Sequence, residues 1–95
     1  MSAYFVARVN ITDPEKYREY TSVTPGVIKQ YGGKFVIRAG NMVTLDGPEV
    51  TDRIVVIEFE TLEKVQEFYN SKEYQQAKEL RKDASTGWAV AIEGV

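Results

Sequence analysis

The chain has 95 residues, which suffices for one domain with a modest core. It contains neither cysteine nor histidine, which excludes disulfides, thiolate catalysis, the usual haem ligand and the commonest zinc ligands, so we expect no metal and no other cofactor. The net charge of −2 is distributed without runs of like charge, and we therefore expect no binding to nucleic acid or to an anionic membrane.

The N-terminal segment does not match a signal peptide, because it lacks a basic start and Arg8 interrupts its apolar run. No apolar stretch approaches the roughly 20 residues needed to span a bilayer. We therefore expect a cytoplasmic protein with a single domain over residues 1–95.

The first part of the chain predicts a strand followed by a helix. Residues 3–11 are rich in β-branched and aromatic side chains, which favour a strand. Asp13 followed by Pro14 is typical of a helix start, and the paired glycines 32–33 are typical of its end. Pro25 inside this helix predicts a kink or a second helix start, because proline removes a backbone donor and clashes with the preceding turn.

Two strands joined by a turn are predicted next. The second strand is expected over residues 34–45, weakened or bulged near Gly40 and Asn41. A turn at residues 46–48 separates it from residues 52–59, which contain an unbroken run of β-branched side chains. This run is the strongest strand signal in the chain.

The last part of the chain predicts a second helical region and a final strand. Thr61 is expected to cap a helix that is interrupted near residue 70, and Ser71 is expected to cap a further helical piece that continues to Arg81. The final strand is expected over residues 88–92. The resulting order, β-α-β-β-α-β, is that of an α+β, ferredoxin-like fold with a four-stranded antiparallel sheet.

Alternation of side chains divides each predicted strand into two faces. One face of every strand is wholly apolar, and we expect the helices to cover it. That face comprises Phe5, Ala7, Val9, Ile11, Phe35, Ile37, Ala39, Val55, Ile57, Phe59, Trp88, Val90 and Ile92. The other face is apolar except for one charge in each strand. That second face comprises Tyr4, Val6, Arg8, Val36, Arg38, Ile54, Val56, Glu58, Ala89, Ala91 and Glu93.

The second face is too apolar to be left in water. A four-stranded sheet with one solvated face should alternate apolar and polar side chains, and a large apolar patch usually marks an interface. We therefore expect a homodimer in which two copies of the sheet pack face to face by two-fold symmetry. The charged side chains Arg8, Arg38, Glu58 and Glu93 would then lie inside this interior or at its mouth.

Several segments of the sequence are distinctive. They are Tyr17…Tyr20, Tyr31-Gly32-Gly33, Arg38-Ala39-Gly40, Val56-Ile57-Glu58-Phe59, Phe68-Tyr69-Asn70-Ser71 and Glu73-Tyr74-Gln75 through Arg81. Together they resemble the domain-of-unknown-function 1330 family, short bacterial proteins grouped with the dimeric α+β barrels. The resemblance covers essentially the whole chain, although the family often has Arg-Gly-Gly where this chain has Arg38-Ala39-Gly40.

This resemblance implies a fold and an assembly rather than a reaction. It implies a ferredoxin-like unit that pairs as a dimeric α+β barrel, and it brings no established activity. Related barrel families include cofactor-free monooxygenases of aromatic polyketides, muconolactone-type isomerases and haem enzymes. Because one fold hosts many functions, the chemistry has to be argued from individual residues.

Glu58 is the first candidate for chemistry. A carboxylate on a buried apolar face suits a general acid or base, but it could equally pair with an arginine across the sheet. Arg38 and Arg8 could bind a carboxylate or enolate oxygen of a ligand through their planar forks of donors. Alternatively, they could be the structural partners of Glu58 and Glu93.

Three further candidates, Tyr69, Tyr74 and Arg81, lie on or beside the second helical region. Phenols that line a cleft can hydrogen-bond a ligand, but tyrosines at helical spacing also serve as core residues with a solvated hydroxyl. Ser71 has no histidine to activate it, so we interpret it as a helix cap rather than a nucleophile.

Two functions remain open. The first is a non-catalytic dimeric protein, which either binds small organic molecules or is a packed module. The second is a cofactor-free enzyme, monooxygenase- or isomerase-like, in which Glu58 carries a proton and Arg38 stabilises a developing oxyanion. If the dimer interior is functional, both residues should face one cavity there, with Tyr69, Tyr74 or Arg81 at its rim. A cavity of about 300 Å³ or more would favour ligand binding.

Overall fold

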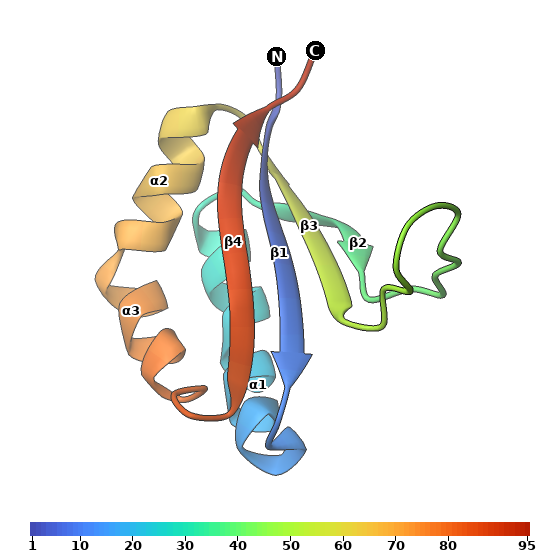
Figure 1. Ribbon diagram of the computed structural model, residues 1–95. Helices are drawn as coiled ribbons and strands as arrows, with labels where there is room; N and C mark the ends of the chain where they lie inside the picture. Colours follow the sequence, from blue (N-terminus) through green and yellow to red (C-terminus); the bar gives the residue numbers. More distant parts are fainter.

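Four strands and three helices make up the chain, and the computed structural model describes all of residues 1–95 (Figure 1). In chain order the elements are β1 (Ala3–Ile11), α1 (Pro14–Gln30), β2 (Lys34–Arg38), β3 (Arg53–Phe59), α2 (Leu62–Asn70), α3 (Lys72–Glu79) and β4 (Ser85–Glu93). This order confirms the predicted α+β, ferredoxin-like fold, with the second helical region divided into α2 and α3. None of the helices combines the length and the apolar character needed to cross a membrane.

Short polar side chains start each helix where the sequence predicts. Asp13, Thr61 and Ser71 each accept a hydrogen bond from the backbone N–H three residues later, at 3.2, 3.1 and 3.0 Å respectively. These bonds satisfy donors that have no partner inside the helix. Ser71 therefore acts as a helix cap, and its hydroxyl also donates to the carbonyl of Phe68 at 2.7 Å.

Two predicted boundaries are corrected. Of the two outcomes expected at Pro25, a kink or a second helix start, the second start does not occur, because α1 runs as one helix through that residue. Proline removes a single backbone donor, and the turns on both sides of it are anchored by buried side chains such as Tyr17 and Ile28. Strand β2 ends at Arg38 rather than at residue 45, because Ala39 adopts a left-handed φ of 53° and the chain leaves the sheet as a loop (Figure 1).

The strands form one antiparallel sheet in the order β2-β3-β1-β4, with all helices on one side of it (Figure 1). The core lies between the sheet and the helices. Its members are Ala3, Phe5, Ala7, Val27, Ile28, Ile57, Phe59, Val65, Phe68 and Tyr74. The paired glycines let α1 end close against the sheet: Gly32 has a φ of 79°, and a Cβ on Gly33 would lie only 2.7 Å from Phe59 Cζ.

We call the sheet face that points away from the helices the open face. The strand registers assign to it Tyr4, Val6, Arg8, Ile37, Ile54, Val56, Glu58, Trp88, Val90 and Ile92. This face is largely apolar, as predicted. Trp88 and Val90 are about half exposed, at 53% and 48%. In a monomer, the open face therefore presents a continuous apolar surface to water.

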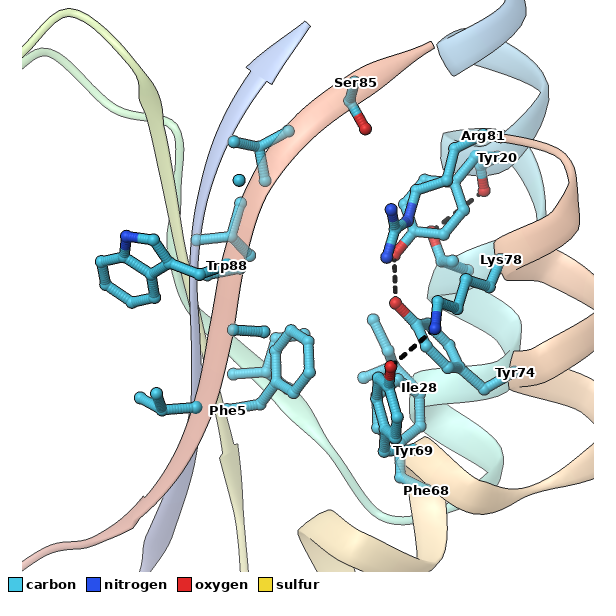
Figure 2. A pocket seen from close by; sticks show the side chains of 18 of the residues that line it. Phe5, Tyr20, Ile28, Phe68, Tyr69, Tyr74, Lys78, Arg81, Ser85 and Trp88 are labelled. Atoms are coloured by element: carbon cyan, nitrogen blue, oxygen red, sulfur yellow. Dashed lines mark hydrogen bonds between the residues drawn. The ribbon is translucent and has the colours of Figure 1, made fainter. Parts of the chain in front are cut away.

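Strand β4 faces the opposite way from the prediction. Its register with β1 places Trp88 beside Arg8, so that Trp88, Val90 and Ile92 lie on the open face, and Figure 2 shows Trp88 pointing away from the helices. The helix-facing side chains of β4 are Ala89, Ala91 and Glu93. The prediction failed because pairing with the neighbouring strand, not the apolarity of one strand, decides which side chains meet the helices. The small alanines leave space beneath the helices.

Candidate functional site

A cavity of about 630 Å³ lies between the helix side of the sheet and helices α1, α2 and α3 (Figure 2). Its sheet wall carries Phe5 and Ala7 of β1 together with Ala89 and Ala91 of β4. These two alanines remain exposed although they face the helices, so the cavity is open beside β4. Its volume falls within the range of about 300–1,000 Å³ that is usual for small-molecule sites.

The helix wall of the cavity carries phenol groups joined by hydrogen bonds. The hydroxyls of Tyr20 and Tyr74 lie 2.8 Å apart, and Lys78 Nζ donates to the Tyr69 hydroxyl at 2.7 Å (Figure 2). The guanidinium of Arg81 lies 5.3 Å above the centre of the Tyr20 ring. The wall thus offers aromatic surface and several polar hydrogens to a ligand.

The protonation states of this wall follow from its surroundings. Burial raises the pKa of Tyr20 far above its ordinary value, and the adjoining Tyr74 phenol adds to the effect. Burial also raises the pKa of Tyr17, although the positive charges of Arg53 and Arg81 oppose the rise. Burial alone would lower the pKa of Arg81, but hydrogen bonding and charge interaction with Tyr74 and Tyr20 outweigh it and raise the pKa. Near neutral pH Tyr17 and Tyr20 are therefore neutral, and Arg81 carries a positive charge.

The raised tyrosine pKa values predict a loss of stability at alkaline pH. In the unfolded chain tyrosine loses its proton near pH 10, whereas Tyr20 and Tyr17 keep theirs in the folded protein, so the unfolded state binds fewer protons above that pH. Above pH 10 the buried Tyr20 should lower the free energy of unfolding by up to roughly 1.4 kcal/mol per pH unit, and Tyr17 should add to the decline. Urea unfolding between pH 8 and pH 11 should show this decline, and Tyr20→Phe should make it shallower. An identical decline in the variant would contradict the assignment.

Four cationic side chains line the cavity, and no carboxylate does. They are Arg38, Arg53, Lys78 and Arg81. Arg38 extends from the exposed end of β2 and stacks on Phe35, with 4.4 Å between the guanidinium carbon and the ring centre. None of the four forms an ion pair within the chain, whose two salt bridges join Arg8 to Asp52 and Lys64 to Glu67. The lining of the cavity therefore carries a net positive charge.

The predicted site residues divide between the two sides of the sheet. Tyr69, Tyr74, Arg81 and Arg38 all line the cavity. Glu58 and Arg8 do not, because both lie on the open face. Glu58 stands beside Tyr4 and Lys34 of the neighbouring strands. Arg8 forms an ion pair with Asp52, with 3.0 Å between its Nε and the carboxylate.

The prediction that Glu58 and Arg38 face one cavity is wrong. A bulge shifts the register between Phe35 and Ile37, so Ile37 pairs with Val56 on the open face and Arg38 pairs with Val55 on the helix side. The one-residue slip reverses the side to which every later side chain of β2 points. The two residues therefore lie on opposite sides of the sheet, and the cavity that exists is within the chain, under its helices.

Among the ionisable residues that line the cavity, sequence reasoning missed four: Tyr17, Tyr20, Arg53 and Lys78. A signal for Lys78 was present, since it follows Tyr74 by four residues and so shares its side of a helix. A signal for Arg53 was present too, because it lies two residues before Val55 and therefore on the same strand face. Both were passed over because the site was sought on the other side of the sheet.

Among curated proteins, no sequence matches this chain. Solved structures share its fold at low identity. A protein of unknown function from Rhodopseudomonas palustris has a TM-score of 0.78 at 18% identity, with 99% of this chain and 82% of that chain covered. SnoaB, a cofactor-independent oxygenase from Streptomyces nogalater, has a TM-score of 0.69 at 10% identity, with 99% and 93% covered.

A third structure is described as a dimeric protein of unknown function with a ferredoxin-like fold, from Bacteroides fragilis. Its TM-score is 0.63 at 16% identity, with 98% of this chain and 96% of that chain covered. At these identities the likenesses establish the fold alone. The family model described as "Domain of unknown function (DUF1330)" matches residues 2–95. The chain belongs to the DUF1330 family.

Proposed function

We propose that this protein binds a small organic molecule in the cavity between its sheet and its helices. The observation that carries the proposal is a cavity of about 630 Å³ with an aromatic wall whose hydroxyl groups point inward. A merely packed module would fill such a space, since protein interiors are normally close-packed. The small side chains Ala89 and Ala91 instead keep the cavity open at β4.

A cofactor-free enzyme is the second candidate, but the residues that would act in it differ from those predicted from the sequence. The pair Glu58 and Arg38 cannot act on one substrate, because the two side chains lie on opposite sides of the sheet. What favours catalysis is the group formed by Tyr20, Tyr74 and Arg81, in which neutral phenols and a fixed positive charge could stabilise a negatively charged oxygen. The fold is shared with a cofactor-independent oxygenase, which makes the candidate worth testing once a ligand is known.

We further propose that the protein is a homodimer whose open faces pack together. The support is the apolar surface formed by Val6, Val56, Val90 and Ile92, which a soluble monomer rarely exposes. A structure with the same fold is described as dimeric. The cavity lies on the other side of the sheet from this face, and Trp88 and Val90 of the edge strand β4 border both.

Ligand binding is tested by filling the cavity. N-Phenylnaphthylamine is a neutral aromatic dye whose fluorescence rises in an apolar site, and the wild type should bind it saturably. Ala89→Phe places a ring in the cavity and should weaken this binding by at least about tenfold, because the dye and the ring compete for the same volume. Val43→Phe adds a similar ring on the exposed loop, 79% exposed, and should leave binding unchanged. Equal binding by all three proteins would contradict the proposed site.

A further inference from the structure

Arg53 is held on the helix side of the sheet by the register of β3. It pairs with Val9 of β1 and lies two residues before Val55, so its side chain extends toward the cavity that it lines. The neighbouring carboxylate of Asp52 points to the other side of the sheet and is engaged by Arg8 at 3.0 Å. The nearest acid in the sequence is therefore not available to Arg53.

The guanidinium of Arg53 contains an unsatisfied donor. Its Nε is the only buried side-chain nitrogen or oxygen in the chain that has no hydrogen-bond partner. Folded proteins almost always pair such atoms, because a buried donor without an acceptor loses its hydration and gains nothing in return. A charged donor that is left in this state inside a cavity indicates that the acceptor comes from a bound molecule.

The other cations of the cavity strengthen this indication. Arg38 pairs with Val55, and so lies diagonally across from Arg53 on the same sheet face. On the helix wall, Lys78 already donates to the Tyr69 hydroxyl. Lys78 thus has a hydrogen-bond partner and Arg81 stacks on the Tyr20 ring, whereas the Nε of Arg53 has no partner. The positive charge of Arg53 nevertheless acts on the Tyr17 phenol.

We infer that the molecule bound in this cavity is an organic anion with an aromatic or apolar body, and that Arg53 binds its anionic group. This inference rests on the proposed function and narrows it. A carboxylate or a similar oxyanion can engage Nε and a terminal nitrogen of the guanidinium together, which a neutral group cannot do as well. The apolar body then lies against Phe5 and the phenols of the helix wall.

The test compares two dyes that differ by one anionic group. Anilinonaphthalene sulfonate has the aromatic frame of N-phenylnaphthylamine with one sulfonate added. The wild type should bind the anionic dye about tenfold more tightly than the neutral one, and Ala89→Phe should weaken both. If neither dye binds at the cavity, the proposed function fails. If both bind there with equal affinity, the proposed function stands and the anion inference is overturned.

Variants of Arg53 test the residue itself. Arg53→Gln should remove the roughly tenfold preference for the anionic dye while leaving the affinity for the neutral dye within about twofold. Arg53→Lys keeps the charge without the fork and should give an intermediate preference. Arg8→Gln removes an arginine from the opposite side of the sheet and should retain the full preference. A full preference in Arg53→Gln would overturn the assignment.

Stability provides a second readout of Arg53. Because its Nε has no partner within the chain, Arg53→Gln should leave the urea midpoint of the free protein unchanged or raise it. A saturating concentration of the anionic dye should raise the midpoint of the wild type and not that of the variant. A variant that is markedly destabilised without dye would show that Arg53 has a structural partner, and would overturn the inference.

Discussion

Replacing Val90 by glutamate is expected to convert a homodimer of about twice 10.8 kDa into a monomer. Val90 belongs to an apolar row that crosses the whole open face: it pairs with Val6, Val6 pairs with Val56, and Val56 pairs with Ile37. When two such faces pack together, this row becomes the centre of the interface. A carboxylate at position 90 would then be buried without a partner in both protomers.

The expected size of the effect follows from the cost of burying charge. Removing an unpaired carboxylate from water costs several kcal/mol, and each roughly 1.4 kcal/mol weakens the dimer about tenfold. In the monomer the same side chain costs little free energy of folding, since position 90 is half exposed and a glutamate there reaches water. The substitution should therefore disrupt the dimer by several orders of magnitude and leave the fold in place.

Sedimentation at micromolar concentration measures the outcome directly. The wild type should sediment as a dimer and Val90→Glu as a monomer with an unchanged circular dichroism spectrum. Val43→Glu, on the exposed loop, is the matched control and should remain dimeric. A wild type that is monomeric at these concentrations, or a Val90→Glu variant that remains dimeric, would contradict the assignment of the open face.

The elements of the fold could be predicted because their signals are local. A cap such as Asp13 or Ser71 bonds a backbone group only three residues away, so a short stretch of sequence determines it. The glycine pair that ends α1 acts in the same way. The element order, and with it the ferredoxin-like fold, follows from a series of such local decisions.

The sheet face to which the side chains of β2 and β4 point could not be predicted, because pairing with strands elsewhere in the sequence determines it. The bulge at Val36 reverses Arg38, and it is defined only by how β2 pairs with β3. The orientation of β4 depends on its register with β1, at the other end of the chain. In both cases the strand's own pattern is compatible with either orientation, since both of its faces carry apolar side chains.

The site was found in part for the same reason. Tyr69, Tyr74 and Arg81 were identified because they lie on or beside a helical region that the local sequence defines, where the resemblance to the family also places them. Glu58 was assigned to the same site only by assuming which side of the sheet held the cavity. The assumption reversed the roles of the two sides: the open face is the expected interface, and the helix side holds the cavity.

Tyr74 connects the cavity to the core, and its removal is expected to have the largest effect on stability. The side chain is 1% exposed. Its ring lies 4.7 Å from the ring centre of Phe68, 5.4 Å from that of Tyr69, 6.2 Å from that of Tyr20 and 6.5 Å from that of Phe5. The ring of Tyr74, which belongs to α3, thus packs against side chains of α1, α2 and β1.

Tyr74→Ala should lower the free energy of unfolding by about 3–5 kcal/mol, because it removes a buried ring and leaves a hole among four aromatic neighbours. Against a total stability of roughly 5–15 kcal/mol, this change brings the protein close to unfolding. Tyr74→Phe keeps the ring and removes only the hydrogen bond to Tyr20, so it should cost about 1 kcal/mol. Urea unfolding at pH 7 measures both. If the two variants were equally destabilised, the hydroxyl network rather than ring packing would hold α3 in place, and the cavity wall would depend on the protonation of its phenols.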